Sequence, residues 1–364
     1  MESTGEVDNL SYTNTTDTIK IKTTTKTRTK KNELCFDLFN IENCFFFIIV
    51  NIFYKIYAMK VLILGGTKFF GKSFALDMHK RGHEVCVFSH THSNDLPKEI
   101  KQVLGERGSF KDLSPLAQEN WDIVLDNICF TAEQAQLAVD LFKNNIKHWL
   151  FVSTGDVHLV LKGAKSPYTE KMSKTLEVDN KKTEPYGGGK LEAEEVLKKA
   201  YKDFRFPYTT IRFPIVIGEN DPKNRCLPYW QKIVNGEEIP LPDGGNFNRR
   251  YIYIKDCVRA LNSVIKNFPQ TKNETFHFGD NKTLTLKEFI ELSAKLLNKK
   301  ANTKNISYNL LKEKGYDFTK NSPYYKHGDY VLDINKAEKL LDWVSTPLEV
   351  WLKDTMNFYF KQEQ

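Results

Sequence analysis

The clearest signal along the chain is a series of short apolar segments that alternate with helical patterns. Residues 61–64 read Val-Leu-Ile-Leu, and residues 85–88 read Val-Cys-Val-Phe. Continuous apolar runs of this length are typical of strands that are buried on both faces of a parallel sheet. Between them, Phe74, Ala75 and Met78 share one face of a helix predicted over residues 72–80. The pattern therefore predicts a strand, a helix and a second strand, which together form a βαβ unit.

The same alternation continues toward the middle of the chain. A strand-like run at residues 122–126 leads through a helical pattern at residues 132–144 to another strand at residues 149–152. After Arg212 the pattern loosens into loops marked by Pro, Gly and Asn, and residues 286–298 predict an amphipathic surface helix. Repeated alternation of strands and helices indicates an α/β protein with a parallel sheet.

Residues 1–58 differ from the rest of the chain. The first thirty or so are mainly Thr, Asn and Lys, which predicts disorder because little apolar surface is available for burial. The apolar run at residues 44–54 is interrupted at Asn51 and is shorter than the ~20 residues that a membrane helix needs. Three interpretations stay open for this segment: an interfacial membrane anchor, an ordered packing segment, or an extension unrelated to the fold.

Composition narrows the class of protein without choosing a function. The chain has 364 residues, of which 40% are hydrophobic and 27% charged, and this excludes a wholly disordered, collagen-like or multi-span membrane protein. Acidic and basic residues cancel within residues 1–58, so the net charge of +7 belongs to residues 59–364. The six cysteines show no CxxC pair and the histidines no HExxH motif, so we predict reduced thiols, an intracellular protein and no metal site.

The turn after the first strand has the character of a dinucleotide-binding loop. It reads Gly65-Gly66-Thr67-Lys68-Phe69-Phe70-Gly71, and we assign all seven residues to cofactor binding. Gly65 permits a tight turn close to a pyrophosphate, and Gly71 lets the following helix approach the strand, so that the helix N-terminus offers free N–H groups to phosphates. Lys68 stands where a GxxGxxG pattern would have its middle glycine. By itself, the motif is also consistent with an ordinary βα turn.

The end of the second strand bears on the choice of cofactor. It carries Ser89 and His90 in place of the Asp or Glu that would bind the ribose hydroxyls of NAD. NAD and NADP both stay open, with a lean toward NADP because these residues tolerate a 2′-phosphate. Asp126 and Asn127, at the end of the strand at residues 122–126, are further cofactor-binding candidates.

Five motifs, one of them the glycine turn just described, together carry a resemblance to a known family. Tyr186 and Lys190 are four residues apart, so on a helix they share one face. The motifs are GGTKFFG at residues 65–71, STGDV at 153–157, YGGGK at 186–190, IRFPIVIGENDP at 211–222 and RRYIYIKD at 249–256. With them, the chain from Met59 almost to its end resembles the extended short-chain dehydrogenase/reductases, the NAD-dependent epimerase/dehydratase family, in an atypical branch with a GGTxFxG turn.

The resemblance implies a fold and a division of the chain. The fold is a Rossmann-type doubly wound parallel sheet with a smaller α/β C-terminal region that binds substrate. We expect the NAD(P)-binding domain at residues 59–215 and the mainly substrate-binding region at residues 216–364, with a return to the first domain near residues 249–265. A homodimer and a cytoplasmic location are also expectations from the family.

The resemblance also implies catalytic residues. Tyr186, as a phenolate, would exchange a proton with a sugar hydroxyl while hydride passes to or from the nicotinamide. Lys190 would favour the phenolate and hold the nicotinamide ribose, and Thr154 would hydrogen-bond the substrate oxygen. The dehydratases of the family have an Asp where this chain has Gly155, so water elimination is disfavoured and epimerase or oxidoreductase chemistry remains.

Substrate-binding candidates lie in the C-terminal region. Arg249 aligns with a family arginine that grips a substrate diphosphate, and Arg250 follows it. Asn220, Arg225 and Tyr229 are additional candidates for the pocket. The expected substrate is a nucleotide sugar or a related polar metabolite. The alternative is a dinucleotide-binding RNA-associated or regulatory protein that resembles the chloroplast stem-loop-binding proteins, but no RNA-recognition signature supports a nucleic-acid partner.

Overall fold

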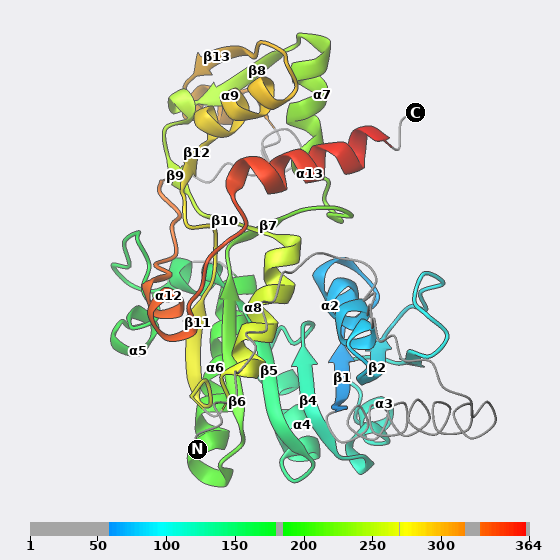
Figure 1. The fold of residues 1–364 in the computed structure, drawn as a ribbon. Helices are drawn as coiled ribbons and strands as arrows, with labels where there is room; N and C mark the ends of the chain where they lie inside the picture. The colour runs from blue at the N-terminus through cyan, green and yellow to red at the C-terminus, as the bar shows by residue number, and fades with distance from the viewer. Residues whose placement is uncertain (1–57, 180–184, 269, 317–327, 362–364) are drawn as a thin grey trace, which may run out of the picture. The chain divides into compact units, whose positions relative to one another are not determined.

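Seven parallel strands form the central sheet of the molecule (Figure 1). The computed structural model describes residues 58–179, 185–268, 270–316 and 328–361, so the predictions for the N-terminal extension and its apolar run lie outside the described residues except at Ala58. Along the sheet the order is β11-β6-β5-β4-β1-β2-β3. The strands are β1 (Lys60–Leu64), β2 (Glu84–Ser89), β3 (Lys101–Leu104), β4 (Trp121–Asp126), β5 (Ile146–Thr154), β6 (Tyr208–Phe213) and β11 (Glu274–His277).

The strand order confirms the predicted doubly wound sheet. It runs outward from β1 in one direction to β3 and from β4 in the other to β11, so the switch point lies between β1 and β4. All six strand pairs are parallel. The carboxyl ends of β1, β2, β4, β5 and β6 therefore lie at one edge, where such sheets bind their ligands.

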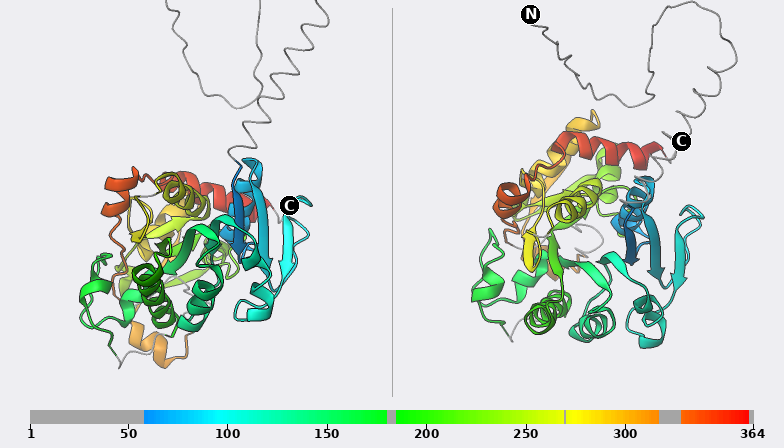
Figure 2. Two further views of the ribbon diagram at one scale, coloured as in Figure 1. Left: turned by 90° about the horizontal axis from the view of Figure 1, so that it is seen from below. Right: turned by 60° about the horizontal axis from the view of Figure 1, so that its bottom comes forward.

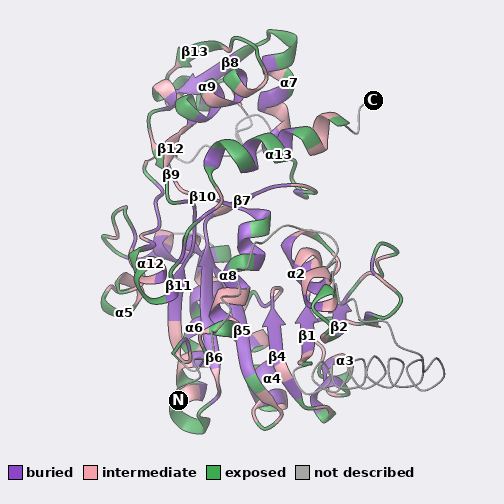
Figure 3. Cartoon of the chain, viewed as in Figure 1, coloured by how far each residue is buried: buried purple, intermediate pink, exposed green. Residues whose placement is uncertain are grey.

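Helices cover both faces of the sheet, which explains the continuous apolar runs in the sequence. Val61 and Ile63 of β1 belong to one core with side chains of α2 (Phe69–Lys80) and α8 (Ile254–Lys266). Leu62 and Leu64 point to the opposite core, shared with α4 (Ala132–Phe142) and α6 (Pro185–Phe204). Figure 2 shows α4 and α6 side by side, and Figure 3 shows the strands buried between the helix layers.

The predicted elements are present with shifted ends. The first helix begins at Phe69, three residues earlier than the pattern predicts, with Lys68 as its N-cap. The predicted surface helix is α9 (Leu286–Leu296), which starts at a capping box formed by Thr285 and Glu288. The sequence pattern did not predict the edge strand β3. Short elements link the strands: α3 (Phe110–Leu113), η1 (Leu116–Gln118), η2 (Gly155–Val160) and α5 (Met172–Thr175).

The C-terminal half contributes to the sheet and also forms smaller sheets. β7 (Ile215–Ile217) pairs with β10 (Tyr251–Tyr253), β8 (Glu238–Pro242) with β13 (Asn302–Ile306), and β9 (Asn248–Arg249) with β12 (Leu284–Thr285). The chain returns to the main sheet through α8 and β11. The remaining helical elements are α7 (Leu227–Asn235), η3 (Asp243–Gly245), α10 (Tyr308–Glu313), α12 (Asn335–Leu341) and α13 (Leu348–Lys361). Over the described ranges, no helix combines the length and apolar character needed to cross a bilayer.

Candidate functional site

The glycine turn after β1 is shaped by contacts that exclude side chains. Gly65 has φ +90°, and a Cβ there would stand 2.5 Å from Cγ2 of Ile128. A Cβ on Gly71 would collide with the backbone carbonyl of Gly65. Asn127 Nδ2 donates a 3.3 Å hydrogen bond to that same carbonyl, so the structure brings this predicted residue to the turn. The close approach of α2 to β1 leaves the start of the helix facing the carboxyl edge of the sheet, as a pyrophosphate site requires.

The other residues of the turn that we predict to bind the cofactor would do so mainly through their backbone N–H groups rather than through their side chains. Phe70 is buried, and its ring packs edge-on against Phe213 with 5.6 Å between centroids. Phe69, at φ +50°, begins α2, and Lys68 is exposed beside it. Gly66 is buried, and a Cβ there would stand 2.8 Å from Cγ2 of Ile63. The predicted cofactor roles of residues 66–70 therefore depend mainly on N–H groups at the helix start.

At the end of β2 the two predicted residues differ in exposure. The Ser89 side chain is buried, and its hydroxyl donates a 2.5 Å hydrogen bond to the Thr91 carbonyl. His90 is exposed. This position therefore offers an imidazole and no carboxylate to a ribose.

Asp126 is placed differently from our prediction. Its carboxylate is buried and forms an ion pair of 2.6 Å with Arg107, which also donates to the Gln134 carbonyl at 3.1 Å. A buried carboxylate paired in this way, through an arginine that also bonds Gln134, braces the loop after β4. The side chain of Asp126 is thus engaged by Arg107 and that of Asn127 by the turn, and the cofactor role of both stays a prediction.

Lys190 is buried at the centre of the predicted catalytic set. It is 1% exposed, and its Nζ donates a 2.7 Å hydrogen bond to the Val152 carbonyl. The ammonium lies 4.8 Å from the ring centroid of Phe130 and 5.1 Å from that of Phe151. Burial lowers the pKa of Lys190 to about 8, because the charged form loses hydration.

Tyr186 and Thr154 lie on the elements next to this lysine. Tyr186 is in the first turn of α6, one turn from Lys190, and its side chain is 44% exposed. Thr154 ends β5, and its Oγ1 accepts a 3.2 Å hydrogen bond from the Asp156 backbone N–H. Accepting that bond uses a lone pair, so the hydroxyl proton of Thr154 is not consumed by it.

The three glycines between Tyr186 and Lys190 fix the first turn of α6. A Cβ on Gly187 would collide with the Asp156 carbonyl, and one on Gly189 would collide with the Phe130 carbonyl. Gly188 has no atom within 4 Å of the corresponding point. The backbone at the start of α6 therefore packs closely against the backbone of η2 on one side and of the loop after β4 on the other. This packing places Tyr186 near η2, the element that follows Thr154.

The C-terminal segment completes this side of the site. Tyr330 is 2% exposed, and its hydroxyl donates a 2.6 Å hydrogen bond to Oδ1 of Asp156. Its N–H donates to the Asn248 carbonyl, and its carbonyl accepts from the Arg250 N–H. Sequence reasoning missed Tyr330, because the residues around it carry no local pattern that points to a partner so distant in the chain.

A buried ion pair lies behind the catalytic set. Arg212 on β6 binds Glu194 on α6 through two hydrogen bonds, of 2.9 and 2.5 Å, and both side chains are fully buried. Ser153, next to Thr154, donates a 2.6 Å hydrogen bond to the same carboxylate. Arg212 also donates to Ser173 at 2.7 Å. These contacts tie β5, β6, α5 and α6 together next to the candidate catalytic residues.

The two predicted diphosphate arginines do not act as a pair. Arg249 is buried, and its guanidinium donates to the carbonyls of Asn248 at 2.8 Å and Gly328 at 2.5 Å. The Arg250 guanidinium donates instead to the Asp280 carbonyl, and burial lowers the pKa of this arginine. Neighbouring residues on an extended strand point to opposite sides, so one diphosphate cannot bridge both guanidinium groups. The backbone of both arginines lies beside Tyr330, with Arg249 in a parallel bridge to it and the Arg250 N–H bonded to its carbonyl.

The three remaining substrate candidates have different surroundings. Tyr229 is in the apolar core, with its ring 6.1 Å from that of Phe289, so it does not line an open pocket. Arg225 is half-buried and forms a 2.7 Å ion pair with Asp221. Asn220 is exposed, with φ +57°. Of the three, Asn220 alone presents an exposed side chain.

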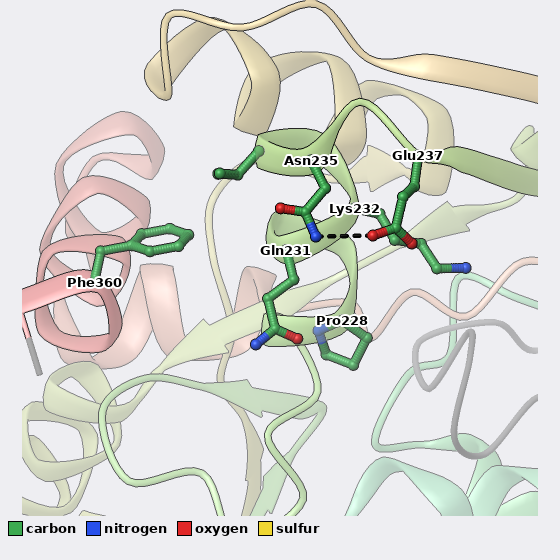
Figure 4. Close-up of a pocket in the computed structure, with 7 residues that line it drawn as sticks. Pro228, Gln231, Lys232, Asn235, Glu237 and Phe360 are labelled. Carbon is green, nitrogen blue, oxygen red and sulfur yellow. Dashed lines mark hydrogen bonds between the residues drawn. The ribbon is translucent and has the colours of Figure 1, made fainter. Parts of the chain in front are cut away.

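A cavity of about 490 Å³ lies between α7 and the end of α13 (Figure 4). Its lining includes Gln231, Lys232 and Phe360, and Asn235 donates a 2.8 Å hydrogen bond to Glu237 at its rim. None of its lining residues belongs to the glycine turn or to the predicted catalytic set.

Together, the sheet order and the glycine turn define a doubly wound α/β protein of the dinucleotide-binding class. A model of the NAD dependent epimerase/dehydratase family matches residues 61–279, and the chain belongs to that family. It is an NAD-dependent enzyme of the extended short-chain dehydrogenase/reductase type, as the resemblance implied.

Relatives and solved structures agree with the family. The chain is 25% identical over 300 residues to the chloroplast stem-loop binding protein of 41 kDa b from Arabidopsis thaliana, with 78% of this chain and 74% of that protein covered. It is 24% identical to the dTDP-4-dehydro-6-deoxyglucose reductase of Escherichia coli, covering 66% of this chain and 83% of the relative. The crystal structure of Thermotoga maritima UDP-glucose 4-epimerase with UDP-glucose matches at a TM-score of 0.67 with 18% identity, over 84% of this chain and all of that one.

Proposed function

We propose that this enzyme is an epimerase or oxidoreductase that acts on a nucleotide sugar or a related polar metabolite through Thr154, Tyr186 and Lys190. The observation that carries the proposal is the placement of a half-exposed tyrosine one helical turn from a buried ammonium, at the carboxyl edge of a doubly wound sheet. Backbone contacts at Gly187 and Gly189 hold that turn in place.

The three side chains suit proton exchange at a hydroxyl. A free phenol has a pKa of about 10, so Tyr186 needs a nearby positive charge to serve as a base near neutral pH. Lys190 supplies that charge while it is protonated, which a pKa of about 8 ensures at pH 7. Thr154 orients the substrate oxygen by donating its hydroxyl proton. When bound, NAD supplies hydride acceptance and return.

The glycine turn fits a dinucleotide, because side chains at Gly65 and Gly71 would close the space against Ile128 and the Gly65 carbonyl. The N–H groups at the start of α2 would hold the pyrophosphate. We also keep NADP as a candidate cofactor in addition to NAD. Ser89 and His90 place no carboxylate at the end of β2, so no negative charge there would repel a 2′-phosphate. The solved UDP-glucuronic acid 4-epimerase of Bacillus cereus, which shares the fold, was crystallised with NAD.

The substrate class is inferred from several relatives named for sugar nucleotides. Arg249 is the residue proposed to meet a substrate diphosphate, because guanidinium groups bind phosphate oxygens bidentately. The RNA-associated alternative has the support of one relative's name, whereas the family model describes epimerases and dehydratases. We therefore place it second.

Thermal-shift measurements on the full chain with NAD, NADP and a panel of UDP- and dTDP-sugars test the proposal, since a ligand of the native state raises Tm by mass action. Tyr186→Phe should lower turnover by about 100-fold or more and leave cofactor binding intact. An undiminished rate in that variant would exclude the mechanism. Salt-sensitive RNA binding without hydride transfer on any sugar nucleotide would favour the alternative.

A further inference from the structure

Phe130 is an exposed aromatic residue that touches both principal members of the catalytic set. Its side chain is 43% exposed, at the end of the loop after β4. Its ring centroid is 6.2 Å from that of Tyr186 and 4.8 Å from the Lys190 ammonium. Its carbonyl faces Gly189, between those two residues on α6. Phe130 therefore contacts both the tyrosine and the lysine of the candidate catalytic set while part of its ring stays open to solvent.

Phe130 covers the outer side of the Lys190 ammonium. Phe151, which is fully buried, lies 5.1 Å from the same group, and the Val152 carbonyl accepts its hydrogen bond. The charged or titratable groups that act on Lys190 are Asp126 and Cys129 at the end of β4 and in its following loop, Glu194 on α6 and Arg107 in the loop after β3. Phe151 and Val152 belong to the sheet, so Phe130 is the half-exposed ring beside the ammonium.

The loop that carries Phe130 is held by a buried network. The Phe130 N–H donates a 2.7 Å hydrogen bond to Oε1 of Gln134, and the Gln134 carbonyl accepts one from Arg107. Arg107 is in turn fixed by its ion pair with Asp126. The carboxylate that sequence reasoning assigned to the cofactor thus braces the position of the Phe130 ring.

We propose that Phe130 is a positioning residue of the active site. Its ring shields the Lys190 ammonium from water, and it packs against the Tyr186 ring and holds that ring in place. This inference rests on the proposed function for its catalytic meaning, although its physical basis is independent of the substrate. Shielding keeps the ammonium poorly hydrated, which agrees with the lowered pKa of Lys190. Removal of the ring admits water to the ammonium, while the contacts with Phe151 and Val152 remain.

Titration of Lys190 in the full chain without cofactor tests the proposal. Protein labelled with ¹³C-lysine is followed by NMR across pH 6–11, and the Lys190 signal is assigned by its loss in Lys190→Met. We expect a midpoint near pH 8 in the unmodified protein. Phe130→Ala should raise the midpoint by about one pH unit, because the hydration that the ammonium gains outweighs the loss of the cation–π attraction. Phe130→Tyr, which keeps the ring, should restore the original midpoint.

Phe204 offers a matched control. It is 54% exposed, and its ring centroid lies 4.8 Å from the ammonium of Lys143, away from the catalytic set. Phe204→Ala should leave the Lys190 midpoint unchanged. Circular dichroism and Tm show whether each variant is folded. An unchanged or lower midpoint in folded Phe130→Ala would overturn the proposal.

The outcomes separate this inference from the proposed function. A raised midpoint in a protein that converts no sugar nucleotide would support the shielding role and reject the proposed function. An enzyme that converts a sugar nucleotide, but whose Lys190 midpoint is the same with and without the Phe130 ring, would support the proposed function and reject the shielding role. Where both hold, the alkaline limb of the pH profile of kcat should move upward by the same amount in Phe130→Ala, a change that a purely structural role would not produce.

Discussion

The hydroxyl of Tyr330 donates a 2.6 Å hydrogen bond to Asp156 and occupies the space beside Gly155. A Cβ on residue 155 would stand 2.5 Å from that hydroxyl and 2.8 Å from Cδ2 of Leu332. The position at which the family's dehydratases carry an acid is therefore filled by the C-terminal segment. Packing therefore explains why residue 155 is a glycine, and the expectation that elimination of water is disfavoured stays a prediction.

Gly155→Ala should destabilise the fold by about 1–3 kcal/mol, because the new methyl group overpacks a buried site. Urea unfolding measures the change. Adding Tyr330→Phe should recover part of the loss, since the hydroxyl contact disappears and the Leu332 contact remains. Gly108→Ala is the control, because its nearest atom would be 4.0 Å away. Equal stability of the Gly155 and Gly108 variants would contradict the steric argument.

The glycines of the first turn of α6 should respond differently to alanine. Gly188→Ala should stabilise the protein by up to about 1 kcal/mol, because alanine favours a helix and nothing lies near its Cβ. Gly187→Ala and Gly189→Ala should each destabilise by about 1–3 kcal/mol through collision with backbone carbonyls. Chemical unfolding of the three single variants tests this order, and a stabilising Gly187→Ala or Gly189→Ala would disprove the packing of this turn.

The Arg212–Glu194 pair should show strong coupling. Arg212→Met or Glu194→Leu alone should cost about 3–5 kcal/mol, because each leaves a buried charge without its partner. The double variant should lose less than the sum of the single changes. A double-mutant cycle by urea unfolding measures the difference, and strict additivity would show that the two side chains do not act as a pair.

Buried histidines should make the protein sensitive to acid. Burial lowers the pKa of His148 to about 3 and that of His158 to about 2, whereas an unfolded histidine titrates near 6.5. Below pH 6.5 the unfolded chain therefore binds more protons than the folded protein. As the pH is lowered, the free energy of unfolding decreases by up to about 1.4 kcal/mol per pH unit for each histidine. The loss continues until the folded-state pKa values are reached.

His148→Gln tests this linkage, because glutamine can replace the 2.7 Å hydrogen bond to Thr209 without titrating. Unfolding free energies at pH 4.5, 5.5 and 7.5 should show a shallower dependence than in the unmodified protein. A slope unaffected by His148→Gln would mean that this histidine has the same pKa in the folded and unfolded states.

The pattern of apolar residues predicted the strands whose side chains are all buried. The glycine motif predicted the turn after β1, where the structure has no room for larger side chains. β1 was predictable because all its apolar residues enter one of two cores. Phe130 and Tyr330 were missed because their partners are distant in sequence, so no local spacing marks them. A signal for Phe130 does exist, since a large aromatic residue lies in the loop after the strand that ends at Asp126.

Charged candidates were the least predictable part of the site. Asp126 and Arg250 have the expected chemistry, yet their partners, Arg107 and the Asp280 carbonyl, turn them toward the protein interior. Sequence alone shows which residues carry charge but not which charges neutralise one another. Tyr229, a predicted pocket residue, lies in the apolar core, because an aromatic residue in the core and one in a pocket have the same local pattern.

The bond between Tyr330 and Asp156 joins residues 174 positions apart, and this has a consequence for synthesis on the ribosome. A nascent chain that ends after β6 already contains Thr154, Tyr186 and Lys190, but not the hydroxyl that fixes Asp156. It also exposes β6 as a free sheet edge until β11 is made. The hydrogen bond that fixes Asp156 can therefore form only after the segment with Tyr330 has been synthesised.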